Sequence, residues 1–165
     1  MLIFTYGTLM RGFGNNRILQ AKSWGVDMAD KIKPATFVGE AVTAGRFSMK
    51  DIGFPYIRRG RQAKAEHKPV PVVGELWDIG DPNNDPAAKL MLEMLDRLEG
   101  VAGGHYDRVT HICYIGGDRS KPVSANLYHA TTKTWERVQW APDVPDCNWG
   151  ERNKERRKDE TRKAG

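Results

Sequence analysis

Cysteine is scarce in this chain, and long apolar runs are missing. The 165 residues include only two cysteines, Cys113 and Cys147, which are too few for the disulfide framework of a small secreted domain. The chain opens directly with the composition of a strand, without the basic segment and apolar stretch of a secretory signal. We therefore expect a cytoplasmic protein. No apolar run approaches the length of a membrane-spanning helix, so we expect no membrane contact.

Motifs for metal, phosphate and covalent chemistry are also missing. The four histidines do not have the spacing of a metal site. His111 and Cys113 would share one face of a strand, but two ligands without two more are typical of packing. No serine or cysteine lies in a nucleophile elbow, and no glycine-rich loop carries a phosphate-binding lysine. We therefore expect no metal and no cofactor, and a reaction that needs no enzyme nucleophile.

Positive charge is concentrated at the end of the chain. The formal net charge is +5, and Glu151–Gly165 contributes +3 from seven basic and four acidic residues, which leaves +2 for residues 1–150. Such a tail can contact nucleic acid, but a solvated end, disordered or partly helical, is more typical. A second basic stretch, Arg58–Pro69, is expected to be an exposed hairpin loop. We predict one domain over residues 1–135 and a charged extension over residues 136–165.

The apolar pattern predicts an α+β domain with a curved, largely closed sheet of about six strands. Glycine inside one of these strands, at Gly74, indicates a bulge or a close approach of another backbone. The segment Gly53–Ile57 has a proline between aromatic residues, which suits an edge strand or a loop over a pocket. The expected strands are Met1–Tyr6, Thr36–Thr43, a strand beginning at Arg46, Val70–Ile79, Tyr106–Ile115 and Pro122–Ala130.

Two helices are expected. A short one runs from Asn15 or Asn16 to about Trp24. The second is the strongest in the sequence, because Asp85 and Pro86 are a favourable cap and first residue and Gly100 supplies the stop. Its apolar residues recur at helical spacing over Lys89–Leu98, and they are Met91, Met94, Leu95 and Leu98.

The turn after the first strand is the candidate binding site. The sequence Tyr6-Gly7-Thr8-Leu9 follows an apolar run, and a glycine there leaves room for a ligand to lie on main-chain N–H groups. Such donors bind a carboxylate or an oxyanion without a charged side chain. An ordinary strand end has the same pattern, so spacing alone leaves both interpretations open.

The end of the second helix supplies a candidate acid or base. Asp96 and Glu99 are three residues apart and share a face, while Leu95 and Leu98 point to the core. A carboxylate at a helix C-terminus faces the negative end of the helix dipole, and shielding from water raises its pKa further. Glu99 is therefore a candidate general base, although a surface glutamate before a capping glycine would give the same pattern.

Five motifs in order resemble the γ-glutamylcyclotransferase-like family, including its γ-glutamylamine cyclotransferase branch and its plant avirulence-induced relatives. The likeness covers about residues 1–130. It implies a small mixed β-barrel of about six strands with two main α-helices, and the release of 5-oxoproline from a γ-glutamyl compound. The motifs are Tyr6-Gly7-Thr8-Leu9, Gly53-Phe54-Pro55-Tyr56, Val73-Gly74-Glu75-Leu76-Trp77, Leu95-Asp96-Arg97-Leu98-Glu99-Gly100 and Tyr106-Asp107-Arg108.

The resemblance also implies roles for individual residues. Glu99 corresponds to the catalytic acid or base, and the pair Thr8-Leu9 is most similar to the amine-directed and plant branches. Tyr6 and Tyr106 each either border the pocket or only pack, and Arg108 either binds a carboxylate or pairs with a nearby acid. The alternative is a non-catalytic module that binds a small molecule in the barrel or an acidic partner through its tail. The expected substrate-binding residues are Tyr6, Gly7, Thr8, Leu9, Tyr106 and Arg108.

Overall fold

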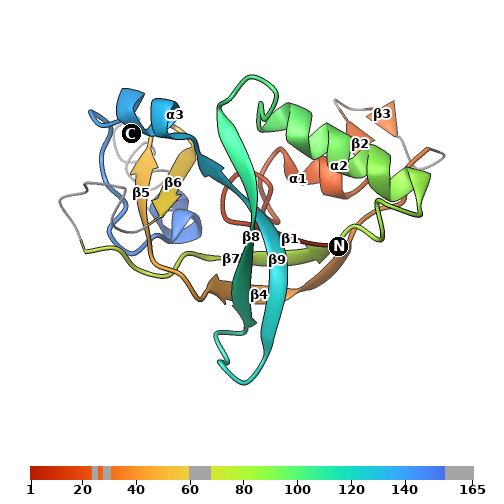
Figure 1. Ribbon diagram of the computed structural model, residues 1–165, viewed down its shortest axis with the longest axis horizontal. Coiled ribbons are helices and arrows are strands. Elements are labelled where there is room, and N and C mark those ends of the chain that lie inside the picture. Colours follow the sequence, from red (N-terminus) through yellow and green to blue (C-terminus); the bar gives the residue numbers. More distant parts are fainter. Residues whose placement is uncertain (24–25, 28–30, 60–67, 155–165) are drawn as a thin grey trace, which may run out of the picture.

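Five strands close into a barrel in the order β1–β7–β4–β8–β9 (Figure 1). The computed structural model describes residues 1–23, 26–27, 31–59 and 68–154. The β1–β9 pair is parallel and the other pairs are antiparallel, so the predicted α+β fold with a mixed barrel is confirmed. The barrel strands are β1 (Leu2–Thr5), β4 (Thr36–Thr43), β7 (Val73–Asp78), β8 (Tyr106–Ile115) and β9 (Pro122–Ala130).

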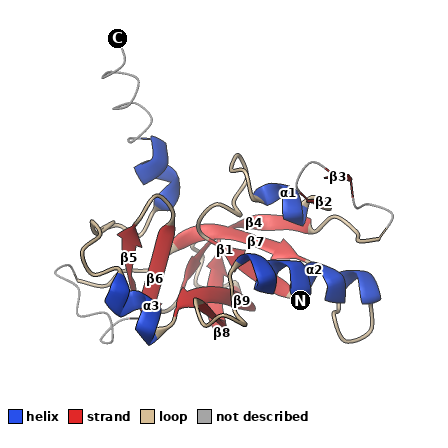
Figure 2. Ribbon diagram, turned by 90° about the horizontal axis from the view of Figure 1, so that it is seen from above, coloured by secondary structure: helices blue, strands red, loops and turns tan. Residues whose placement is uncertain are grey.

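The remaining elements lie at the two ends of the barrel (Figures 1 and 2). At one end are α1 (Asn16–Leu19) and α2 (Pro86–Leu98), with the two-residue strands β2 (Lys22–Ser23) and β3 (Val26–Asp27) beside α1. At the other end are the hairpin of β5 (Phe47–Asp51) and β6 (Pro55–Arg59), and α3 (Thr132–Arg137). Residues 149–154 are also helical. No helix within the described residues combines the length and apolar character of a membrane span.

Most predicted elements are present, but several are shorter than predicted. The strands β4, β8 and β9 have the predicted bounds, but β7 begins at Val73 because Val70 makes only an isolated bridge to Phe47. The first helix ends at Leu19 rather than near Trp24, which lies outside the described residues. It ends early because Ala21 adopts a left-handed conformation with a φ of 59°, which cannot continue an α-helix.

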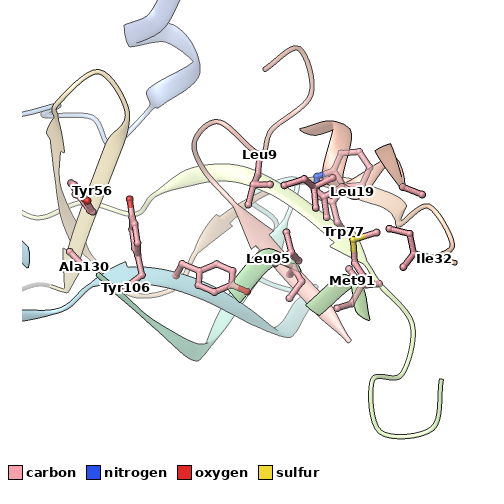
Figure 3. Close-up of a cluster of buried hydrophobic side chains, with 14 of the residues drawn as sticks. Leu9, Leu19, Ile32, Tyr56, Trp77, Met91, Leu95, Tyr106 and Ala130 are labelled. Carbon is pink, nitrogen blue, oxygen red and sulfur yellow. The ribbon is translucent and has the colours of Figure 1, made fainter. Parts of the chain in front are cut away.

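The buried side chains form two clusters. One lies between the barrel and the helices and includes Leu19, Trp77, Met91 and Leu95; Figure 3 shows these residues at one end of the cluster, with Tyr56 and Tyr106 together at the other. The second cluster joins the barrel to the hairpin and to the end of the chain. It includes Phe4, Phe47, Val144, Cys147 and Trp149.

Described residues beyond 135, up to residue 154, therefore pack on the rest of the protein, and two ion pairs fix them to the hairpin. The Lys50 ammonium lies 3.0 Å from a carboxylate oxygen of Asp143, and both side chains are buried. The Arg152 guanidinium lies 3.2 Å from a carboxylate oxygen of Asp51. The domain boundary at residue 135 stays a prediction, and most of the charged tail, residues 155–165, lies outside the described residues.

The prediction that Arg58–Pro69 is an exposed loop is wrong for its first residue. Arg58 belongs to β6 and is 8% exposed. Its guanidinium donates hydrogen bonds of 2.6 Å to the Ala130 carbonyl and to the Thr132 hydroxyl. Composition cannot reveal this burial, because the acceptors come from residues more than 70 positions away. The remainder of the loop, residues 60–67, lies outside the described residues.

At Gly74, β1 lies too close to β7 to leave room for a side chain. A Cβ atom on Gly74 would lie 2.1 Å from the Thr5 carbonyl oxygen and 2.7 Å from the ring of Phe4. No side chain fits between the two strands, so the sequence prediction of a close backbone approach is confirmed at this position.

Replacing Gly74 by alanine should therefore destabilise the protein. We expect Gly74→Ala to lower the free energy of unfolding in urea by more than about 2 kcal/mol, because the strands must separate to admit the methyl group. Gly14→Ala is the control, since a Cβ there would meet no atom within 4 Å, and it should change stability by less than about 1 kcal/mol. Equal effects of the two substitutions would contradict this account.

Candidate active site

The loop after β1 is held in place by hydrogen bonds from its own turn and from α1. The Met10 N–H donates to the Gly7 carbonyl at 3.0 Å. The side chain of Asn16 donates to the Leu9 carbonyl at 2.7 Å, and that of Asn15 donates to the Thr8 hydroxyl at 2.9 Å. These bonds fix the loop between the end of the strand and the first helix.

The barrel holds the far end of the same loop. Arg11 donates from its main-chain N–H and from Nε to the two carboxylate oxygens of Glu75, at 2.9 and 2.8 Å. The Trp77 indole N–H donates to the same carboxylate at 3.2 Å. Glu75 is 7% exposed, and its burial is tolerated because the carboxylate is both paired and hydrogen-bonded.

The loop has unused donors and little free space beside it. Within the described residues, the main-chain N–H groups of Gly7, Thr8 and Leu9 donate to no protein acceptor. A Cβ on Gly7 would lie 2.7 Å from the ring of Pro55 at the start of β6. Only glycine therefore allows the hairpin to close against the loop, and the donors stay available for a ligand.

Helix α2 delivers Glu99 to this region. The helix begins at Pro86, where the capping carboxylate of Asp85 accepts the Ala87 N–H at 2.9 Å. It ends at Leu98, and Gly100 leaves the helix with a φ of +62°. Glu99 is the C-cap residue, and no group among the described residues donates a hydrogen bond to its carboxylate. Burial raises the pKa of Glu99 from 4.5 to about 7.

A cavity of about 220 Å³ joins the loop to Glu99. Its wall contains Glu99, Tyr106 and all four residues of the predicted binding loop, so the structure brings these candidates together. Arg108 is not part of the wall, because its Nε lies 3.0 Å from a carboxylate oxygen of Asp96. The lining residues are Phe4, Thr5, Tyr6, Gly7, Thr8, Leu9, Asn15, Phe54, Pro55, Leu98, Glu99, Tyr106 and Tyr128.

Tyrosine side chains surround the glutamate. Burial raises the pKa of Tyr6 and of Tyr106 well above the usual value, and the nearby negative charge of Glu99 adds to both shifts. The ring of Tyr56 stacks on that of Tyr106 with centroids 4.8 Å apart. These hydroxyls are therefore protonated at neutral pH.

Sequence reasoning missed Tyr128 as a residue of this cavity. It lies in β9, where its hydroxyl donates to Asp96 at 2.7 Å and its carbonyl accepts from the Tyr6 hydroxyl at 2.6 Å. No motif marks this position. Its place in the wall follows from the register of β8 and β9, in which it pairs with Arg108, and that register is not visible in the sequence.

The pair His111 and Cys113 lies outside the cavity. The His111 ring contacts Phe47 edge to face, with centroids 5.3 Å apart, and Cys113 is fully buried. Within the described part of the chain, no three His, Cys, Asp or Glu residues are placed to hold a metal ion.

Comparisons with known proteins agree with this architecture. Residues 3–151 match the family model described as gamma-glutamyl cyclotransferase, AIG2-like. An AIG2-like protein from Mus musculus is 20% identical, with a TM-score of 0.61 over 88% of this chain and 86% of that one. An uncharacterised protein from Pyrococcus horikoshii is 17% identical, with a TM-score of 0.60 over 95% of this chain and 96% of that one.

A third similar structure is the protein YkqA from Bacillus subtilis. It is 17% identical, with a TM-score of 0.57 over 91% of this chain and 39% of that one, so this chain spans about two fifths of its length. At such identities the structural likeness shows the fold alone. No significant match was found among curated proteins.

The raised pKa of Glu99 makes a prediction about stability and pH. Because its folded-state pKa of about 7 exceeds the reference value of 4.5, folding favours the protonated form, and this contribution is lost as the pH rises through 7. We expect Glu99→Gln to be more stable than the wild type at pH 8.5, by about 1 kcal/mol or more, and to lose this advantage at pH 4.5.

Urea unfolding at both pH values measures this difference. Glu93→Gln is the matched control, since Glu93 lies on the same helix and is exposed, and its stability should follow the wild type at both values. A Glu99→Gln curve parallel to the wild type across this range would contradict burial of the carboxylate in the folded state.

Proposed function

Because the chain belongs to the gamma-glutamyl cyclotransferase, AIG2-like family, we propose that it releases 5-oxoproline from a γ-glutamyl-amine or a γ-glutamyl-amino acid. One observation supports this most directly: the half-buried carboxylate of Glu99 and the unused N–H donors of the loop over residues 7–9 share one small cavity. A base and an anion-binding turn are the two groups that this reaction requires.

The substrate supplies its own nucleophile. The α-nitrogen attacks the γ-carbonyl carbon, a five-membered lactam forms, and the bond between that carbon and the leaving nitrogen breaks. Binding in a bent conformation accelerates such an intramolecular step through orientation. The α-nitrogen loses two protons and the leaving nitrogen gains two, so the protons balance without an external acid or an acyl-enzyme intermediate.

Glu99 is suited to move these protons. A free α-amino group has a pKa of about 8 and is mostly ammonium at neutral pH, so a base must act before the attack. A carboxylate with a pKa of about 7 accepts that proton and can return it to the leaving nitrogen, because the pKa of Glu99 is similar to that of an amino group in this reaction.

The loop is suited to stabilise negative charge. Main-chain N–H groups that are already oriented cost no reorganisation when charge develops on the carbonyl oxygen. The N–H groups of Gly7, Thr8 and Leu9 meet this condition, since the hydrogen bonds from α1 and the contact with Pro55 fix the loop. They would bind either the oxyanion or the substrate α-carboxylate.

The wall of the cavity favours an uncharged or cationic leaving amine. Among the described residues that line it, none is Lys, Arg or His, and Phe54 and Leu98 contribute apolar surface. A carboxylate on the leaving group would meet no cation among these described residues and would be repelled by Glu99. We therefore propose γ-glutamyl-amines as better substrates than γ-glutamyl peptides that end in a carboxylate.

Substitution of Glu99 tests the reaction. We expect Glu99→Gln to lower kcat by about 10²–10⁴-fold, the usual loss of a general base, while Glu93→Gln keeps wild-type activity. The wild-type kcat/KM should fall below pH 7 as Glu99 is protonated. The assay measures 5-oxoproline from γ-glutamyl-lysine, γ-glutamyl-amino acids and glutathione. No product from any of them, with ligand binding unchanged in Glu99→Gln, would favour a non-catalytic binding module.

Leaving-group preference is a separate test. We expect kcat/KM for a γ-glutamyl-alkylamine to exceed that for the matching γ-glutamyl-amino acid, which differs by one carboxylate, by about tenfold or more. Phe54→Lys adds a cation at the wall and should narrow the difference, whereas Phe54→Leu should keep it. Equal kcat/KM values for the two wild-type substrates would contradict the role given to the wall.

A further inference from the structure

A second cavity lies beside the loop that follows β1. Its volume is about 430 Å³, compared with about 220 Å³ for the cavity that contains Glu99. Residues 6–9 of the loop line the cavity of Glu99, and residues 10–13 line the second cavity. The rest of the second wall comes from β4, from β7 and from the helical turn near residue 150. One loop thus borders two separate cavities.

The charged side chains of the second cavity include one more acid than base. The Arg11 guanidinium lies 2.8 Å from the Glu75 carboxylate. The Lys154 ammonium lies 2.7 Å from the Glu151 carboxylate. These four charges cancel in two close pairs, and Glu40 is the fifth charged residue among the described residues of the wall.

Glu40 has oxygen lone pairs that the described residues do not use. The cation nearest to its carboxylate among them is Arg11, whose Nη2 is 3.9 Å away, which is too far for a hydrogen bond. Its side chain is 80% exposed. The negative charge of Glu40 is therefore available to a ligand in the cavity.

Apolar side chains lie in the same wall. They are Met10, Phe13 and Val73. Val73 is 37% exposed although it belongs to a barrel strand, and Phe13 packs on the second core cluster. A carboxylate with free lone pairs beside apolar surface matches a molecule that has a cationic end and a short hydrocarbon chain.

We propose that the second cavity binds an organic ammonium compound with a short apolar chain. An ammonium group has three N–H donors and no acceptor, and its charge balances that of Glu40. An anion is disfavoured, because Arg11 and Lys154 each already have a carboxylate within 3 Å and Glu40 would repel it. The ligand belongs to the same chemical class as the leaving amine of the reaction proposed above, but its site does not include Glu99.

A titration that is read out at Met10 tests this site. The Met10 Cε atom lies 3.9 Å from the position of a Cβ on Gly150, so the methyl group is at the cavity wall. Its NMR signal, assigned with Met10→Leu, is followed in the full chain at neutral pH as n-butylammonium chloride is added. The matched probes are n-butanol and butanoate, which have similar size and differ in charge.

We expect n-butylammonium to shift the Met10 signal with a dissociation constant on the order of 1 mM, as for a small fragment, and n-butanol to bind at least about fivefold more weakly. Glu40→Gln should weaken binding by about three- to tenfold, as for a hydrogen-bonded but exposed charge, and Glu40→Lys should abolish it. Glu93→Gln, an exposed position outside the cavity, and Glu99→Gln should both bind like the wild type.

An unchanged Met10 signal, equal affinities for the three probes, or tighter binding of butanoate would overturn the proposal. Loss of binding in Glu99→Gln with binding retained in Glu40→Gln would also overturn it, because the amine would then lie in the cavity of Glu99. Circular dichroism verifies that each variant folds. The titration requires no turnover, so a failure to form 5-oxoproline would refute the proposed reaction and leave this site standing.

Discussion

The site depends on the close approach of β1 to β7 at Gly74. Only the absence of a side chain allows the Thr5 carbonyl to lie against β7, and this contact sets the register in which Thr5 faces Glu75. Glu75 then accepts both donors of Arg11, and the Arg11 guanidinium lies 3.7 Å from the centroid of the Phe37 ring. Gly74 and Glu75, which are neighbours in β7, thus fix the start and the end of the loop that follows β1 and lines the cavity.

The charged carboxylate of Glu99 destabilises the folded state, and the contacts that hold α2 compensate for this. Burial without a hydrogen-bonding partner disfavours the charged form, and the position at a helix C-terminus adds to this effect. Met91 and Leu95 hold α2 against the barrel, and the bonds of Asp96 to Tyr128 and Arg108 hold its last turn. An ionisable side chain whose charged form is destabilised by its surroundings, in a cavity with unused N–H donors, is typical of a functional site.

The sequence indicated the features that depend on local chemistry. The cap of α2, the turn at Gly100 and the bounds of β8 and β9 follow from neighbouring residues. The order of the motifs along the chain predicted that the first loop and Glu99 belong to one active site. Features that depend on distant partners were not visible. Arg58 lies in a basic stretch yet is buried by acceptors near α3, and the place of Tyr128 depends on strand register. The choice between the two roles of Arg108 likewise required the position of Asp96.

The ion pairs between the hairpin and residues 143–152 have a practical consequence. Phe54 and Pro55 line the cavity, and they follow the two strand residues, Lys50 and Asp51, that pair with Asp143 and Arg152. A shortened gene product that stopped at residue 151, where the likeness to the family ends, would lose one of these clamps. The hairpin side of the cavity wall would then be held less firmly, so a minimal version of this protein should be trimmed no further than the helical turn that contains Arg152.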